Sequence, residues 1–290
     1  MELQQLRYAL AVADRGTFTA AAAACFVAQP SLSHAVGTLE RELGVELFRR
    51  VGRRTTLTAA GEAFVPAARE VLRALDVVRA EVDEVAGVVA GHLDLVALPT
   101  LAVDPVTPMV GAFRATHPAV TVRLAHPEST RALVDRVQSG DSELGITELP
   151  ARGERLRTIS LGRQELVAIL PPGTETPARV DLTRLARHAL VTLPVGTSTR
   201  DTLDTAFEDA GVTPQLAVET DQRDAVVPLV LAGAGAAVVT APVAEVARAQ
   251  GAEVTRLRPP LWRELGLIHR DAPLSPAARA FLALAPASRQ

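Results

Sequence analysis

The sequence contains no lysine, and all 30 of its basic residues are arginine. Because alanine is also very frequent, we interpret this as a genome-wide compositional bias, so that arginine by itself carries no functional signal. The single cysteine, Cys25, excludes an intramolecular disulfide and a zinc site of several cysteines, and it favours a reducing, cytoplasmic location. The first residues lack a basic start followed by a long apolar core, which argues against a secretory signal.

Long apolar runs that would span a membrane are also lacking. The uncharged run 16–39 contains glutamine, serines, threonines and a histidine, which makes it too polar for a bilayer. The run 225–244 is closer to the required length, but Pro228, Gly233 and Gly235 interrupt it. We interpret it as a buried helix, a glycine turn and a buried strand, and we expect no membrane association.

Catalytic and cofactor motifs are missing as well. The sequence has no Gly-x-Ser-x-Gly and no His-Glu-x-x-His, and its six histidines are scattered. Gly233-Ala234-Gly235 lacks the third glycine of a dinucleotide-binding turn, and a strand is expected where that motif needs a helix. We therefore expect no catalytic residue, no metal and no cofactor, and we do not expect an enzyme.

Length and composition fit a globular protein of about two domains, with 290 residues, 48% apolar and 22% charged. The net charge of −3 is unevenly distributed. Residues 1–60 hold seven arginines and five acids, a net charge of +2, so the remainder carries −5. The positive charge of the N-terminal part is concentrated in Arg49, Arg50, Arg53 and Arg54.

The N-terminal part has the pattern of a helix-turn-helix. Helical spacing of apolar residues predicts helices over 3–15 and 30–43, with a short alanine-rich helix over 20–25 between them. Gly16 is suited to end the first helix, and Pro30 is suited to the first turn of the third, where its missing N–H costs nothing.

A wing and a long helix are expected to follow. Two β-prone pieces flank Val51-Gly52 and predict a small hairpin. Thr58 then caps a long helix to about Val85, whose apolar residues mostly step by three and four. Such a stripe fits pairing with another helix.

A polar helix tip and a basic wing together suggest DNA binding. In a helix-turn-helix the second helix lies in the major groove, with its N-terminal residues facing base edges. Short polar groups there hydrogen-bond bases or phosphates, and wing arginines grip phosphates or enter a minor groove. The candidate DNA contacts are Gln29, Pro30, Ser31, Ser33, His34, Thr38, Arg49, Arg50, Arg53 and Arg54. The alternative is an ordinary helical segment with a solvated basic loop.

From residue 93 on, strands and helices alternate, which predicts an α/β sheet with crossover connections. Strands are expected over 93–98, 120–124, 144–146, 166–170, 189–193, 236–240 and 265–268. Helices are expected over 105–117, 129–139, 199–210 and 225–231.

Residues 16–61 carry a dense set of short motifs. They are Gly16-Thr17-Phe18-Thr19, Ala21-Ala22, Gln29-Pro30-Ser31-Leu32-Ser33, Leu39-Glu40, Leu43-Gly44, Leu47-Phe48 and Leu57-Thr58 with Gly61. Together they resemble the winged helix-turn-helix of LysR-type transcriptional regulators. Later features, such as His117-Pro118 and Gly233-Ala234-Gly235, resemble the effector-binding domain of that family. His34 and Ala28 depart from the usual family residues, which leaves the operator sequence open.

The resemblance implies three parts: a winged helix-turn-helix over 1–58, a linker and dimerisation helix with a hinge over 59–90, and an α/β effector-binding domain over 91–290. The last resembles periplasmic binding proteins and consists of two Rossmann-like subdomains joined by two crossovers. Their ranges are 91–161 with 267–290 for the first and 162–266 for the second.

The effector is expected between these subdomains, because ligands of open α/β sheets bind beyond the carboxyl ends of the strands. Hydroxyls at helix N-termini there suit a carboxylate. The candidate effector contacts are Pro99, Thr100, Leu101, Ser129, Thr130, Pro194, Thr197, Thr199 and Arg200. The alternative is that the serines and threonines are plain helix caps.

The resemblance thus predicts a cytoplasmic DNA-binding transcriptional regulator that controls promoter activity in response to a small-molecule effector. It implies homodimers, commonly associated into homotetramers, that bind an interrupted inverted repeat in double-stranded DNA, with RNA polymerase as a further partner. The alternative function is a small-molecule-binding protein or enzyme that uses the α/β domain, with the helical head serving assembly only.

Overall fold

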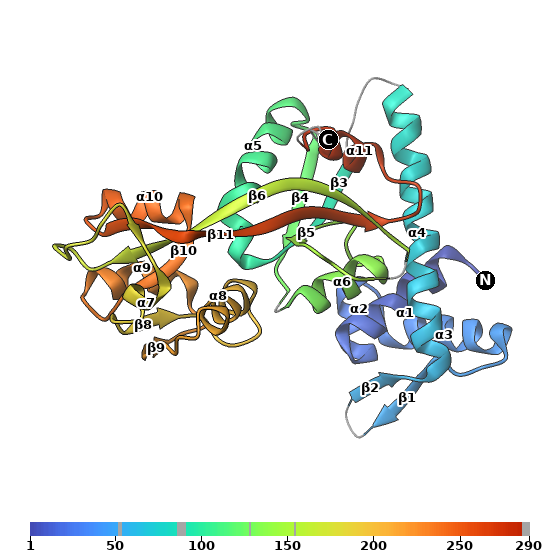
Figure 1. Cartoon of the computed structure of the whole chain (residues 1–290). Helices are drawn as coiled ribbons and strands as arrows, with labels where there is room; N and C mark the ends of the chain where they lie inside the picture. The colour runs from blue at the N-terminus through green and yellow to red at the C-terminus, as the bar shows by residue number, and fades with distance from the viewer. Residues whose placement is uncertain (52–53, 86–90, 128, 154, 286–290) are drawn as a thin grey trace.

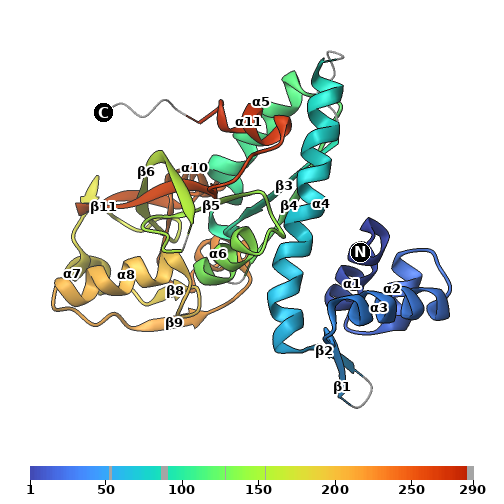
Figure 2. The same ribbon diagram turned by 90° about the vertical axis from the view of Figure 1, so that its right-hand side faces the viewer.

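The computed structural model of the chain describes residues 1–51, 54–85, 91–127, 129–153 and 155–285 (Figure 1). These residues form an N-terminal head, a long helix and a C-terminal α/β domain of two lobes. The long helix, α4, lies between the head and the α/β domain (Figure 2).

The head consists of three helices and a hairpin. Its elements are α1 (Leu3–Arg15), α2 (Phe18–Ala24), α3 (Gln29–Leu43), β1 (Phe48–Val51) and β2 (Arg54–Leu57). Gly16 ends α1 and Gly44 ends α3, both in the left-handed conformation that glycine adopts without strain. The side chain of Thr17 caps α2 by accepting the N–H of Ala20 at 3.1 Å. These local signals define the helix-turn-helix.

The apolar face of α3 holds the head together. Leu32, Val36 and Leu39 are fully buried against α1 and α2, and they recur at the spacing of one helix face. Burial of three such side chains stabilises the head by roughly 1.5–3 kcal/mol each. The opposite face of α3 is left free to carry polar residues.

The junction between the head and α4 (Ala59–Val85) depends on close packing. Val65 of α4 packs on Leu6 and Leu10 of α1. Gly61 lies so near the hairpin that a Cβ there would be 2.2 Å from the carbonyl oxygen of Leu47, which only glycine tolerates. The orientation of the hairpin relative to α4 is therefore set by backbone contact.

Two long antiparallel strands, β6 (Leu156–Leu170) and β11 (Glu253–Arg270), run through both lobes of the α/β domain (Figure 1). Their register shifts between Leu265 and Gly266, opposite Gly162, which has a positive φ of 96°. The subdomain boundaries expected at 161/162 and 266/267 lie close to this irregularity and stay a prediction.

Lobe 1 contains parallel strands covered by helices. Its elements are β3 (Gly91–Ala97), β4 (Val120–Ala125), β5 (Leu144–Glu148), α5 (Thr107–Thr116), α6 (Thr130–Gln138), α11 (Pro276–Leu282) and the short turns η1 (Pro99–Leu101) and η2 (Ala102–Val106). Lobe 2 contains β7 (Arg179–Val180), β8 (Leu190–Thr192), β9 (Leu216–Glu219), β10 (Ala237–Thr240), α7 (Leu182–Leu185), α8 (Ser198–Asp209), α9 (Arg223–Leu231) and α10 (Ala241–Ala249).

The sheet order β10-β6-β11-β5-β3-β4 joins the two lobes through β6 and β11. Lobe 1 has its own core, with Phe113 and Phe281 packed edge to face. Lobe 2 has an apolar cluster on each side of its strands. The carboxyl end of β3 and the N-termini of α6, α8 and α9 meet between the lobes.

The predicted fold class is confirmed. Two strands were predicted too short, and several elements of the structure were not predicted. The strands predicted over 166–170 and 265–268 are only parts of β6 and β11. The remaining halves alternate irregularly between exposed and buried residues, so their pattern was not recognisable as strand. The sequence also did not predict β9, α10 or α11. None of the described helices is long and apolar enough to cross a membrane.

Candidate DNA-binding surface and ligand cleft

The N-terminal end of α3 is a polar, uncapped helix tip. Pro30, Ser31 and His34 are exposed, and Gln29 and Ser33 are half-buried. The cap residue is alanine, so no side chain caps the helix. Pro30 has no N–H, and the N–H of Ser31 already donates to the carbonyl of Ala28 at 3.1 Å. The positive end of the helix dipole is still suited to an incoming phosphate.

A second polar group on α3 lies one turn further along. The Thr38 hydroxyl donates to the carbonyl oxygen of His34 at 2.9 Å and accepts from Nη2 of Arg41 at 2.8 Å. Arg41 is exposed and its Nε also donates to the carbonyl of Gly37. Sequence analysis did not select Arg41, although its spacing of seven from His34 places both on one side of the helix.

The hairpin forms a wing that is fixed to the head. The carboxylate of Glu40 accepts the N–H groups of Leu47 and Phe48 at 2.8 and 3.2 Å, and the N–H of Thr55 donates to the carbonyl of Gly16 at 2.8 Å. These bonds hold the wing at a defined angle to α3.

The structure describes two of the four predicted wing arginines in full. Arg49 and Arg54 are exposed on β1 and β2, and Nε of Arg49 donates to the hydroxyl of Thr56 at 3.3 Å. The side chain of Arg50 and the whole of Arg53 lie outside the described residues. The described arginines thus lie on the strands of the wing, which is drawn below the helices of the head in Figure 1.

A small pocket between the lobes contains five of the nine predicted effector contacts. Its lining residues are Leu98, Pro99, Thr100, Ser129, Thr130, Gly196, Thr197, Ser198 and Arg223. The cavity volume is about 10 Å³, close to the ~10–15 Å³ that one water needs on the same measure. The pocket is therefore too small for an organic effector in this conformation.

The other four predicted contacts do not line the pocket. Leu101 is fully buried in the core of lobe 1, and the Pro194 carbonyl accepts the hydroxyl of Thr197 at 2.8 Å. Thr199 is buried behind the pocket. Arg200 forms ion pairs with two carboxylates of lobe 2, Asp204 and Glu219, at 2.7 and 3.0 Å.

A buried arginine, Arg263, lies directly behind the pocket. Its side chain is 2% exposed. Nε and Nη2 both donate to Oε1 of Gln164, at 2.9 and 2.5 Å, and Nη2 also donates to the Thr100 carbonyl at 3.0 Å. Nη1 approaches the hydroxyls of Thr100, Ser198 and Thr199 at 3.3–3.4 Å. Arg263 thus connects the crossover strands, lobe 1 and lobe 2.

Two carboxylates influence this arginine without forming an ion pair with it. Gln164 donates to Asp104 at 2.6 Å, and Glu148 accepts the hydroxyl of Thr202 at 3.1 Å. Burial lowers the pKa of Arg263 to about 10, against the opposing charges of Glu148 and Asp104, so it stays charged at neutral pH. Burial also raises the pKa of Glu148.

Sequence analysis missed Ser198, Arg223 and Arg263. In β11, Leu261, Arg263 and Leu265 lie on one face of the strand, where Leu261 is half-buried and the other two are buried. The sequence did not reveal this face, because the strand was not predicted over 253–264. No local signal marks Arg223 either.

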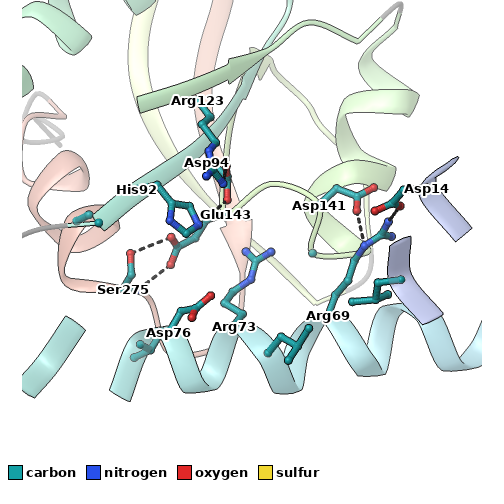
Figure 3. Close-up of a pocket in the computed structure, with 16 residues that line it drawn as sticks. Asp14, Arg69, Arg73, Asp76, His92, Asp94, Arg123, Asp141, Glu143 and Ser275 are labelled. Atoms are coloured by element: carbon teal, nitrogen blue, oxygen red, sulfur yellow. Dashed lines mark hydrogen bonds and ion pairs between the residues drawn. The ribbon is translucent and has the colours of Figure 1, made fainter. Parts of the chain in front are cut away.

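A larger crevice, of about 610 Å³, lies where α1, α4 and lobe 1 meet (Figure 3). Arg69 of α4 reaches across it and pairs with Asp14 of the head and, at 2.7 Å, with Asp141 of lobe 1. Burial raises the pKa of Asp14 although Arg69 opposes the shift. This bridge is a direct contact between the head and the α/β domain.

Further charges surround the crevice. The hydrogen bond from His92 to Asp94, in an ion pair of 3.4 Å, raises the pKa of His92, and Glu143 accepts the N–H and the hydroxyl of Ser275 at 2.7 and 2.8 Å (Figure 3). Burial lowers the pKa of Arg73 on α4, which points into the crevice. Arginines of α4 therefore face carboxylates of lobe 1. No group of three or more potential metal ligands occurs among the described residues.

The described geometry agrees with what comparison with known proteins finds. A family model described as "Bacterial regulatory helix-turn-helix protein, lysR family" matches residues 3–62, and a model described as "LysR substrate binding domain" matches residues 86–289. The HTH-type transcriptional regulator TfdS of Cupriavidus pinatubonensis is 31% identical over 255 residues, which covers 86% of this chain and 85% of that protein.

Solved structures match over the full length. Full-length CbnR in complex with its target DNA is 26% identical, with a TM-score of 0.68 over 98% of this chain and 99% of that chain. A full-length OxyR from Pseudomonas aeruginosa is 24% identical, with a TM-score of 0.76 over 98% and 93%, which shows a common fold.

Proposed function

This chain belongs to the LysR family of bacterial transcriptional regulators, and we propose that it binds an interrupted inverted repeat in promoter DNA as a homodimer and responds to a small molecule held between its lobes. As a member of that family it is a DNA-binding regulator with an effector-binding domain, not an enzyme. The alternative of an α/β enzyme with a helical assembly domain is therefore wrong. Because its target is promoter DNA, we place it in the cytoplasm.

The proposed DNA-contacting surface consists of the tip of α3 and the wing. The observation that carries it is the exposed, uncapped tip of α3 in the same head as the exposed arginines of the wing, which together supply base-reading and phosphate-binding groups. We assign base contacts to Gln29, Ser33, His34 and Thr38, and phosphate contacts to Ser31, Arg49, Arg50, Arg53 and Arg54. Pro30 has no donor and would contribute van der Waals contact with the DNA. We add Arg41, which is exposed on the same helix.

The proposed dimer contact is one face of α4. Val71, Val78 and Val82 are 43%, 58% and 66% exposed, and the exposed Ala67 and Ala74 complete a stripe with steps of three and four. Such a stripe is typical of helices that pair. Two heads related by a twofold axis would read two half-sites, and pairs of dimers would form tetramers. RNA polymerase would be a further partner at the promoter.

The proposed effector site is the cleft, with Pro99, Thr100, Ser129, Thr130 and Thr197 as contacts. Leu101, Pro194, Thr199 and Arg200 would support these residues from behind. Because this pocket has room for only about one water, the proposed effector binds a more open arrangement of the lobes. A ligand that binds only that arrangement shifts the population towards it. The Arg69 bridge offers a route from lobe 1 to the head.

DNA binding is tested with labelled DNA from upstream of the gene, titrated with the full-length protein at several salt concentrations. Arg54→Ala should weaken binding to all sequences and lower the salt slope by about one unit. The control is Arg187→Ala, which removes an exposed arginine of lobe 2. His34→Ala should instead relax the base preference. If the parent protein bound no duplex at low salt, the assignment of the head would be wrong.

A further inference from the structure

We infer that the effector is an organic anion carrying a carboxylate, and that Arg223 at the cleft and Arg263 behind it select this charge. The inference rests on the proposed function of the cleft. The hydroxyls of the cleft already suggested a carboxylate, and the two arginines, which sequence analysis did not select, supply the positive charge that would select it.

Arg223 lines the cleft with a hydrogen-bond donor that has no partner. Its Nε is buried and makes no hydrogen bond, and in the part of the chain that the structure describes it forms no ion pair. Burial lowers the pKa of Arg223, with Asp221 opposing the shift. Arg223 is also the first residue of α9, where the helix dipole disfavours a cation. An anion in the cleft would relieve both the unpaired donor and this repulsion.

One nitrogen of Arg263, Nη1, forms only long hydrogen bonds, and its partners Thr100 and Ser198 line the cleft. Nε and Nη2 form bonds of 2.5–3.0 Å to Gln164 and the Thr100 carbonyl. Nη1 has only contacts of 3.3–3.4 Å, beyond the usual range of about 2.7–3.2 Å for such bonds. No ion pair with a carboxylate is found for Arg263 among the described residues. A fully buried guanidinium without a direct counter-ion favours an anionic ligand nearby.

The hydroxyls between the two arginines complete the site. Thr100 and Ser198 both line the cleft and both face Nη1 of Arg263. A hydroxyl that accepts from a guanidinium keeps its own proton, and Thr100 can donate that proton to a ligand. A carboxylate accepts only, and it offers two oxygens to such converging donors. A neutral amide offers a carbonyl acceptor but no negative charge to compensate Arg223, and an amine would be repelled by it.

Among the described residues, the carboxylates near the cleft form no ion pair with either arginine. Asp201 accepts the N–H of Gly196 at 3.0 Å. One oxygen of Glu148 accepts the hydroxyl of Thr202, and the other is buried without a hydrogen bond. Arg200, the arginine that the sequence suggested, is already neutralised by two ion pairs. In the described part of the cleft, Arg223 and Arg263 thus stand without an ion pair.

The test measures ligand binding to the full-length protein by thermal shift and calorimetry. Formate, acetate, succinate and benzoate are each compared with the matching neutral amide at about 10 mM, which reveals millimolar affinity. Sulfate serves as the inorganic anion. We expect at least one carboxylate to stabilise the protein and its amide not to do so. Arg223→Gln should lower the affinity for that carboxylate at least tenfold, whereas Arg248→Gln, an exposed control in lobe 2, should not.

Arg263→Lys tests the second arginine. It keeps the charge but loses the fork that holds Gln164 and Thr100, so the carboxylate affinity should fall while the protein still folds. The inference is overturned if no carboxylate stabilises the parent, if amides or sulfate act equally well, or if Arg223→Gln binds normally. DNA binding of each variant is measured in parallel. Intact DNA binding with failed carboxylate binding refutes this inference alone, whereas loss of DNA binding by the parent refutes the proposed function.

Discussion

Replacing Arg263 by methionine should destabilise the effector-binding domain strongly. Methionine replaces the apolar stem of the arginine but not the guanidinium, so the change removes the charge and the donors and leaves a small cavity. Two buried acceptors, Oε1 of Gln164 and the carbonyl oxygen of Thr100, then lose the donors that bond to them at 2.5–3.0 Å. Glu148 and Asp104 lose the nearest opposing charge.

The expected loss follows from these contacts. Each buried acceptor left without a donor costs about 1–3 kcal/mol, and two of them cost about 2–6 kcal/mol. Breaking a buried charged network by removing one member typically costs about 3–5 kcal/mol. We therefore expect the free energy of unfolding to fall by about 3–5 kcal/mol. For a domain of this size that lowers Tm by roughly 6–20 °C.

Tryptophan fluorescence gives a domain-specific assay. Trp262 is the single tryptophan of the chain and neighbours Arg263, so its emission during urea unfolding reports the effector-binding domain and not the head. Arg187→Met, at an exposed position of lobe 2, should change the unfolding midpoint little. Removing the acceptor together with the donor, in Gln164→Leu with Arg263→Met, should cost less than the sum of the single changes. A loss below about 1 kcal/mol for Arg263→Met would refute the reasoning.

Three further outcomes follow from the contacts of the head and the crevice. Gly61→Ala should reduce DNA affinity at least tenfold in a binding titration, because the new Cβ would lie 2.2 Å from the Leu47 carbonyl oxygen and displace the wing. The urea transition followed by Trp262 should not change. If the head were instead stabilised, by the ~0.5–1 kcal/mol that alanine gains over glycine in a helix, the predicted clash would be wrong. Arg69→Ala should lose about 1 kcal/mol per ion pair at most and increase hydrogen exchange in α1; unchanged exchange would show that the bridge is not a constraint. Asp94→Asn should return the raised pKa of His92 towards 6.5 in an NMR titration. Since that pKa is raised by folding, the stabilisation from the pair is complete below pH 6.5 and is lost as pH rises through the folded pKa, so parent and variant should converge in stability at high pH.

The head illustrates what local sequence determines. Gly16 and Gly44 end helices by adopting a backbone conformation that other residues avoid. The spacing of Leu32, Val36 and Leu39 is sufficient to predict the buried face of α3. The polar residues of α3 were therefore predictable as a surface. Their roles on DNA stay a prediction.

Local sequence predicted the hydroxyl residues of the effector cleft but not its arginines. Thr100, Ser129 and Thr197 follow strands or begin helices, and such positions meet at one end of an α/β sheet. Arg200 was chosen in the same way. In the structure its charge is satisfied within lobe 2, and Arg223 occupies the cleft instead.

By itself, then, the amino-acid sequence determined the elements of the head, the alternating α/β pattern and the hydroxyls at helix starts, because each depends on neighbours a few residues apart. Only the tertiary structure decided which arginines are neutralised and which still lack a partner. Arg263 meets Thr100 across 163 positions of the chain, and Arg69 meets Asp14 across 55. Residue type gives the charge of a side chain, but its hydrogen-bond partners and its burial come from packing between distant segments.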